Sequence, residues 1–305
     1  MDLSVASNRG EPGWRIESGL AGIVAAVVGA ARRRFAGLSP SDLALTLLLP
    51  AGREAAGASY RGDRPIYPAS LVKLFYLAAL QGWLEAGRLA PSRELAAAAA
   101  AMIGVSSNDA TALVVDLLSG TTGGPALPAA ALHRWVARRR AVNRYFAAWR
   151  CPEFAGINLT QKTWGEGPYG RERQACFEIA GNRNRLTSDA IARLLLAISR
   201  GEAASRRRSA AMLKLMARPL PADKADPFNQ VTGFLGDGLP AGARLWSKAG
   251  WTSQTRHDAA IVELAGGLRF ILVACTSAPA LAADKSLLPY IAERVIAALK
   301  GRSPS

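Results

Sequence analysis

Apolar residues recur along this chain with two different periods, and each period predicts one kind of element. Helical spacing predicts helices over residues 20–31, 70–87, 93–101, 110–118, 129–150, 188–200 and 287–299. Apolar runs of strand length, bounded by turn residues, predict strands over residues 43–50, 55–60, 245–248, 257–264 and 268–276. Strands at both ends of the chain with helices between them indicate an α/β fold whose sheet is assembled from the two chain ends.

The order of these elements predicts two parts. Residues 1–65 and 221–305 form an α/β sheet domain, and residues 66–220 form an inserted helical domain. Within the inserted part, residues 151–185 are rich in Gly, Asn and Arg and show little periodicity. A stretch of that length without regular structure in a compact protein is usually a functional loop. We therefore expect the functional groups at the junction of the two parts.

The composition narrows the class of protein. The chain has 305 residues, and its 50% apolar content supports a sizeable core and excludes a disordered protein. Lysine and arginine number 38 against 23 acidic residues, which gives a net charge of +15. Such a balance fits a nucleic acid, a membrane surface or an anionic substrate. The arginine clusters at 32–34, 138–140 and 206–208 lie far apart without interleaved aromatic residues, so we expect solvated helix faces and no nucleic-acid partner.

Cysteine and histidine positions argue against a bound metal. Cys151, Cys176 and Cys275 have no metal-ligand spacing, and the two histidines, His133 and His257, lie far apart. We expect neither a metal nor any other cofactor. The odd number of cysteines leaves at least one free thiol, and a Cys151–Cys176 disulfide stays open.

The first apolar segment does not have the pattern of an export signal. Residues 20–31 are apolar and precede three arginines, whereas a secretory signal carries its positive charge before the apolar run. The run is also too short to span a bilayer. We expect a soluble protein without a membrane span, cytoplasmic as written, and periplasmic or secreted if a signal has been removed.

The candidate nucleophile is Ser70, at the predicted start of a helix that follows Pro68. Lys73 lies three residues later, so its amine shares a helix face with the Ser70 hydroxyl. A serine becomes a good nucleophile only when a neighbouring base removes its proton, and an amine does so only when neutral. The pair therefore indicates nucleophilic catalysis if burial and a second cation lower the lysine pKa. A helix-capping serine beside a solvated lysine is the alternative.

Two more short motifs follow in chain order. Residues 106–108 read Ser-Ser-Asn before a predicted helix, and residues 248–252 read Lys-Ala-Gly-Trp-Thr at the end of a predicted strand. Together with Ser70 and Lys73 they resemble the S-x-x-K, S-x-N and K-[TS]-G signature of the class A β-lactamases and penicillin-binding proteins. The resemblance covers most of residues 15–300 at low identity. It implies a β-lactamase-like fold with an antiparallel five-stranded sheet and an inserted all-helical domain.

The resemblance also implies catalytic roles. Ser70 attacks an acyl carbon, and Lys73 handles its proton. Ser106 relays a proton towards the leaving nitrogen. Lys248 supplies a positive charge that keeps Lys73 partly neutral and attracts a substrate carboxylate.

Substrate binding is expected from the same motifs. The backbone N–H groups of Ser70 and Trp251 form an oxyanion hole, and Asn108 contacts the amide side chain of the substrate. Arg256 is a second anchor for a carboxylate, with a surface arginine at a strand edge as the equal alternative. The full set of expected substrate-binding residues is Asn108, Gly250, Trp251, Thr252 and Arg256.

The sequence departs from the family pattern in several places. Ala249 replaces the usual hydroxyl residue of the third motif, and Ser107 replaces the usual aspartate of the second. Ser70 and Ser106 are only 36 residues apart, while residues 125–185 form a longer segment than usual. We therefore expect weaker carboxylate recognition and a rebuilt pocket wall.

The residue that releases the acyl group is the most consequential departure. Class A β-lactamases use a glutamate on the omega loop, and an ungapped alignment running back from residues 179–181 places Glu172 there. Glu166 and Glu178 compete if the loop shifts by a few residues. Each is otherwise a surface carboxylate paired with nearby arginines. Without such a base, Ser70 is acylated but turns over slowly, as in penicillin-binding proteins.

These expectations combine into one leading function. The chain is predicted to be a β-lactamase-like serine hydrolase that hydrolyses a β-lactam or a related cyclic or peptidic amide through an acyl-enzyme at Ser70. The expected partner is a small-molecule or peptidic substrate with an anionic group. The alternatives are a penicillin-binding or D-Ala-type peptidase or esterase, and an acyl-capturing sensor with slow turnover. A non-catalytic basic scaffold is disfavoured by the intact motifs.

Overall fold

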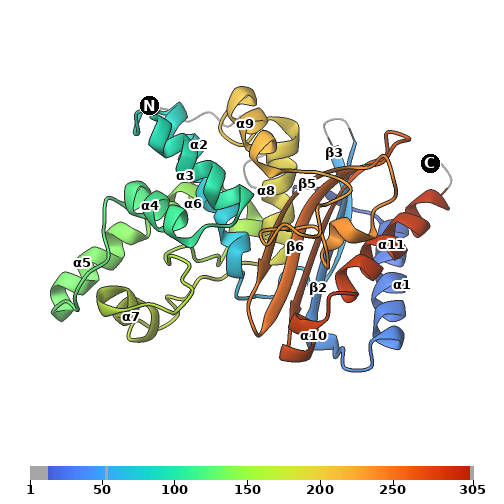
Figure 1. The fold of residues 1–305 in the computed structure, drawn as a ribbon, viewed down its shortest axis with the longest axis horizontal. Coiled ribbons are helices and arrows are strands. Elements are labelled where there is room, and N and C mark those ends of the chain that lie inside the picture. The colour runs from blue at the N-terminus through green and yellow to red at the C-terminus, as the bar shows by residue number, and fades with distance from the viewer. Residues whose placement is uncertain (1–12, 52–53, 303–305) are drawn as a thin grey trace.

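A seven-stranded sheet with helices on both faces organises the molecule (Figure 1). The computed structural model describes residues 13–51 and 54–302. The strands follow the order β1-β3-β2-β7-β6-β5-β4 across the sheet. Their bounds are β1 Arg15–Ile16, β2 Leu43–Ala51, β3 Glu54–Tyr60, β4 Ala217–Arg218, β5 Arg244–Trp251, β6 Thr255–Glu263 and β7 Arg269–Ser277.

The five long strands are the five that the sequence predicts, and each pairs antiparallel with its neighbours. The structure adds a two-residue strand at each edge. β1 pairs in parallel with β3, and β4 pairs antiparallel with β5. The predicted number of strands is therefore two short, because a pair of residues carries no recognisable hydrophobic period.

The helices account for most of the remaining described chain. Their bounds are α1 Ser18–Arg34, α2 Val72–Glu85, α3 Arg93–Gly104, α4 Asn108–Ser119, α5 Ala129–Arg139, α6 Ala141–Ala147, α7 Gly170–Phe177, α8 Ser188–Arg200, α9 Arg206–Met216, α10 Pro279–Ala283 and α11 Leu287–Lys300. The single helix predicted over residues 129–150 is divided into α5 and α6. Arg140 separates them because its backbone, at φ −74° and ψ 13°, leaves the helical region.

The helices cover the two faces of the sheet differently. α1 and α11 pack on one face, as the right side of Figure 1 shows. α8 packs on the other face against β2, β6 and β7, and the remaining helices from α2 to α9 extend outward from that side (Figure 1). Thr187 is the N-cap of α8, and its hydroxyl accepts from Ala190 N at 3.0 Å.

α2 is the central helix of the helical part. Every residue from Val72 to Trp83 is buried, and α3, α4, α6 and α9 all contact this helix. A helix that is apolar all round belongs in a core rather than at a surface. The same core cluster includes Leu48, Ile261 and Val273 from the sheet. Because the core is shared, the division into domains at residues 66 and 220 stays a prediction.

Two further expectations concern cysteines and membranes. Cys151, Cys176 and Cys275 are all free and buried, so the disulfide left open for the first two is not formed. Among the described residues, none of the helices has the length and apolar character needed to cross a membrane.

Candidate active site

Ser70 lies in a single 3-10 turn, Ala69–Leu71, that leads directly into α2. Pro68 begins this turn, and its carbonyl accepts from Leu71 N at 3.0 Å. Ala69 has φ 46°, a left-handed conformation that costs energy for a residue with a Cβ. His257 Nε2 lies 3.0 Å from Tyr67 O and so fixes the segment ahead of the turn. The half-buried Ser70 is thus presented by a strained but well-anchored backbone.

Lys73 points towards Ser106. Its Nζ donates to Ser106 O at 2.6 Å, to Ser106 Oγ at 3.0 Å and to Asn108 Oδ1 at 3.0 Å. No hydrogen bond joins Lys73 to Ser70 Oγ within the described chain, although Ser70 lies in the turn that leads into α2 and Lys73 lies in the first turn of α2. Burial lowers the pKa of Lys73 from 10.5 to about 7. Burial therefore favours the neutral amine that a general base requires.

Ser106 lies between the ends of α3 and α4 with φ 57°. The next residue, Ser107, caps α4 by accepting from Ala110 N at 3.1 Å, and its own N–H donates to Ala101 O at 3.0 Å. Serine and aspartate are about equally good caps, so Ser107 can fill this position without a charge. Ser106 and Asn108 consequently face the same way, towards Lys73.

Lys248 approaches the Ser106 hydroxyl from the opposite side. Its Nζ donates to Ser106 Oγ at 3.0 Å, to Gln230 Oε1 at 2.5 Å and to Ala249 O at 2.7 Å. Lys248 is wholly buried. Burial, followed by the charges of Lys73 and Arg218, holds the pKa of Lys248 well below its ordinary value.

One hydroxyl is therefore shared by two buried amines. Each amine lies 3.0 Å from Ser106 Oγ, so the two nitrogens are within about 6 Å of each other. At an effective dielectric constant of ~20, two unit charges at ~6 Å repel by about 3 kcal/mol, or ~2 pKa units. The pair thus favours a state with one neutral amine, which is what a general base requires.

Gly250 places β5 directly against the Ser70 turn. A Cβ at this position would lie 3.0 Å from the backbone N atoms of both Ser70 and Leu71. Thr252 N donates to Thr255 O at 2.9 Å in the turn that follows β5. Because hydrogen bonding alternates along an antiparallel strand, the Trp251 N–H points away from β6, on the free edge beside Ser70. This arrangement supports the predicted oxyanion hole.

Arg256 does not lie at the surface. It belongs to β6, an inner strand, and its side chain is only 7% exposed. Nε donates to Ala282 O at 2.9 Å, and the guanidinium carbon lies 4.7 Å from the centre of the Phe234 ring. The alternative of a surface arginine is therefore wrong. Its role as a carboxylate anchor stays a prediction.

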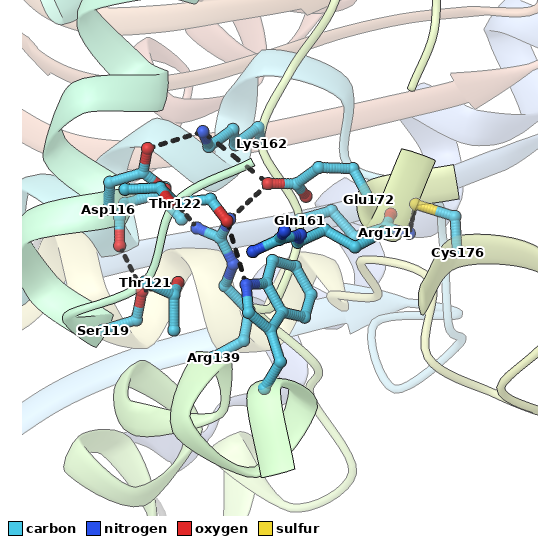
Figure 2. Close-up of polar contacts among 12 residues, drawn as sticks. Asp116, Ser119, Thr121, Thr122, Arg139, Gln161, Lys162, Arg171, Glu172 and Cys176 are labelled. Carbon is cyan, nitrogen blue, oxygen red and sulfur yellow. Dashed lines mark hydrogen bonds and ion pairs between the residues drawn. The ribbon is translucent and has the colours of Figure 1, made fainter. Parts of the chain in front are cut away.

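Glu172 lies in a separate network of buried charges, drawn in Figure 2. It pairs with Arg139 and lies 3.6 Å from Lys162 Nζ. Asp116 closes the ring, at 3.0 Å from Arg139 and 2.7 Å from Lys162 (Figure 2). Burial raises the pKa of Glu172, and the two cations offset part of that rise.

Hydrogen bonds join Lys73, Ser106 and Lys248, and β5 lies against the Ser70 turn, whereas the ion pairs of Glu172 are with Arg139 and Lys162. Glu166 and Glu178, which compete with Glu172 for the role of base, are both exposed. Among the described residues, no carboxylate forms an ion pair with either lysine of the site. The role of Glu172 as the deacylating base stays a prediction.

Comparison with known proteins assigns a family to this geometry. The model of a family described as "Beta-lactamase enzyme family" matches residues 47–299. The chain belongs to this family. Its members are β-lactamase-like serine hydrolases, so the chain is an enzyme of that kind. Comparison with curated proteins gives no significant match.

Solved structures that share the fold of this β-lactamase family member include two β-lactamases and PBP-A. A β-lactamase from Sphaerobacter thermophilus DSM 20745 is 22% identical with a TM-score of 0.64, covering 93% of this chain and 99% of its own. PBP-A is 19% identical with a TM-score of 0.64, covering 95% and 99%. An ancestral class A β-lactamase is 18% identical with a TM-score of 0.63, covering 90% and 99%. These likenesses establish the shared fold.

Sequence reasoning missed three residues around the site of this β-lactamase family member. Gln230 and Arg218 contact β5 from a Pro-rich segment that has no motif. His257 supports the Ser70 turn, and Thr276 N donates to its Nδ1 at 3.1 Å. Burial lowers the pKa of His257 to about 4, so the ring is neutral. A histidine within an apolar strand was the only available signal.

Proposed function

We propose that Ser70 is acylated by a β-lactam or a related amide, and that the acyl group leaves slowly. The observation that carries this proposal is the Ser106 hydroxyl, held at 3.0 Å by both Lys73 and Lys248. In such a pair the neutral amine can take a proton while the other stays a cation.

In the proposed acylation, two protons move as one bond forms and one breaks. Ser70 Oγ bonds to the carbonyl carbon while its proton passes to neutral Lys73. Ser106 donates its proton to the leaving nitrogen as the C–N bond breaks, and it takes a proton from the lysines that share it. The N–H groups of Ser70 and Trp251 stabilise the oxyanion, an effect worth about 3 kcal/mol per donor in related enzymes.

An anionic group on the substrate fits the positive charges close to the Ser70 turn. When Lys248 carries the proton, no carboxylate among the described residues forms an ion pair with it, so its positive field reaches the site. Arg183 is exposed, and its guanidinium carbon lies 5.1 Å from the ring centre of Tyr67 and 5.2 Å from that of Phe177. Tyr67 precedes Ser70 by only three residues, so this cation stands beside the nucleophile turn. A carboxylate is the group most readily recognised there.

Slow release is proposed because the predicted base is already paired. Glu172 forms ion pairs with Arg139 and Lys162, and breaking a buried pair costs about 3–5 kcal/mol. A structure similar to this chain is the acyl-enzyme complex of a PBP-A mutant with penicillin G. The second candidate, a rapidly hydrolysing β-lactamase, needs Glu172 or another carboxylate to reach the acyl group.

Intact-protein mass spectrometry with penicillin G tests this function. We expect a Ser70-dependent adduct that persists for minutes or longer, and none with Ser70→Ala. Glu172→Gln should leave the lifetime of the adduct unchanged within about twofold. A transient wild-type adduct that Glu172→Gln prolongs would instead identify a β-lactamase with Glu172 as its base. Absence of any adduct with activated esters and lactams would overturn acylation at Ser70.

A further inference from the structure

Gln230 connects the third motif to the end of α3. Its Oε1 accepts from Lys248 Nζ at 2.5 Å and from Ala249 N at 3.3 Å. Its Nε2 donates to Ile103 O at 3.1 Å and to Gly104 O at 2.7 Å. Only 2% of the residue is exposed. Every polar atom of the side chain is therefore used, either on β5 or on the chain just ahead of Ser106.

An amide side chain matches both the hydrogen-bonding groups and the absence of charge at this position. It offers an acceptor to an amine and donors to two carbonyl groups without carrying a charge. A glutamate would offer the same acceptor but would add an anion within hydrogen-bond distance of Lys248. Such an anion favours the charged lysine and typically raises its pKa by 1–3 units.

The uncharged state of Gln230 matters because of the charged groups around Lys248. The charged groups that face it are Lys73 from α2, Arg218 from β4 and Asp258 from β6. Asp258 is buried with hydrogen bonds from the backbone N–H groups of Leu235 and Ala259, at 3.0 and 2.8 Å. Lys248 therefore has hydrogen-bond acceptors but no ion-pair partner among the described residues.

We propose that Gln230 is a positioning residue that holds Lys248 on Ser106 without supplying a counter-ion, so that the repulsion between Lys248 and Lys73 is kept. Its neutral amide maintains the condition under which one of the two amines gives up its proton. The catalytic use of that proton rests on the proposed function, but the effect of Gln230 on the lysines does not.

The variant Gln230→Glu tests the charge and is expected to fold. The two carbonyl groups that lose an amide donor keep Arg218, whose Nη1 donates to Gly104 O at 3.1 Å and whose Nη2 donates to Ile103 O at 2.9 Å. Gln230→Met keeps the length of the side chain and removes both acceptor and donors. Gln254→Glu makes the same chemical change on the exposed turn between β5 and β6 and serves as the charge control.

The primary measurement is the lysine titration itself, followed by NMR of protein carrying 13C at lysine Cε. Lys248→Met and Lys73→Met assign the two signals. We expect Gln230→Glu to raise the pKa of Lys248 by at least about 1 unit. Gln230→Met should lower it or leave it unchanged, and Gln254→Glu should move it by less than about 0.3 unit. Equal shifts in the first two variants, or none, would overturn the proposal whether or not Ser70 is acylated.

Acylation supplies a second readout if the proposed function holds. The rate of adduct formation with penicillin G can be measured as a function of pH. In Gln230→Glu the midpoint of this profile should move to higher pH, because the new carboxylate neutralises the charge of Lys248, which then no longer repels a proton from Lys73. In Gln230→Met the rate should fall without an upward shift. A structural residue would slow both variants and leave both midpoints in place.

Discussion

Two clusters of buried cations differ in their partners: one lies among the helices, and the other joins α2 to β5 of the sheet. Arg139 and Lys162 are matched by the carboxylates of Asp116 and Glu172. Lys73 and Lys248 donate to uncharged oxygen atoms among the described residues, and Ser106 Oγ is common to both. Burying an ion pair is tolerable when the charges cancel, whereas burying like charges drives protons off. The first cluster can therefore hold the 151–185 segment in place, and the second can move protons.

The strongest test of this difference removes one amine from the cluster of Lys73 and Lys248, which lacks carboxylate partners among the described residues. Lys73→Met should slow acylation by about 10²–10⁴-fold, the usual contribution of a general base. The free energy of unfolding should not fall, because the variant loses a buried amine that has no carboxylate partner in the part of the chain that the structure describes. Mass spectrometry and urea denaturation measure the two effects. An acylation rate within threefold of wild type would exclude Lys73 as the base.

Removing a cation from the matched cluster should have the opposite outcome. Arg139→Met leaves Glu172 and Asp116 with Lys162 alone, and breaking a buried pair in this way costs about 3–5 kcal/mol of unfolding free energy. The exposed neighbour Arg138→Met is the control and should cost less than about 1 kcal/mol. Urea denaturation compares the two. Equal losses would show that the ring of charges adds nothing to stability.

The pH dependence of acylation is the third test. Burial lowers the pKa of Lys73 to about 7, and only the neutral amine accepts a proton. The rate should therefore rise with pH through a midpoint near 7. Stability should also rise between about pH 7 and 10.5, because the unfolded chain binds a proton there that the folded chain lacks. A rate that is flat from pH 6 to 8 would contradict this assignment.

The smallest effect is expected at Glu172. Glu172→Gln keeps the shape of the side chain and leaves one carboxylate for two cations, so we expect a loss of about 1–3 kcal/mol in unfolding free energy. The lifetime of the acyl-enzyme should not change. A longer lifetime would mean that Glu172 leaves the ring of charges to act in deacylation. The cluster of paired charges would then have a catalytic role as well as a structural one.

Local sequence signals were enough for the long elements and for the motif residues. Five strands and the buried helix after Ser70 follow from the spacing of apolar residues. Ser106, Asn108 and Lys248 were recognisable because each lies at the end of a predicted element. The ungapped alignment at Glu172 was the weakest step, since loop conformation leaves no period in the sequence.

The contacts that cross the fold could not be predicted. The direction of Lys73 towards Ser106 depends on how α4 packs against α2, which no spacing along the chain encodes. Gln230 reaches Lys248 only because the segment after β4 passes the end of α3. The ring formed by Asp116, Arg139, Lys162 and Glu172 joins four separate segments. Such long-range polar contacts are set by tertiary packing rather than by local preference.

The complete burial of α2 bears on how long a covalent ligand stays on this enzyme. A helix enclosed on all sides exchanges its amide hydrogens only when much of the protein opens, so its local motions are small. An acyl group on Ser70 is attached to the first turn ahead of that helix. If Ser70 is acylated as proposed, we expect the residence time of the acyl group to depend on how water reaches the ester bond rather than on local motion of α2. A covalent inhibitor that shields this ester from water should then dissociate more slowly than one that leaves it exposed.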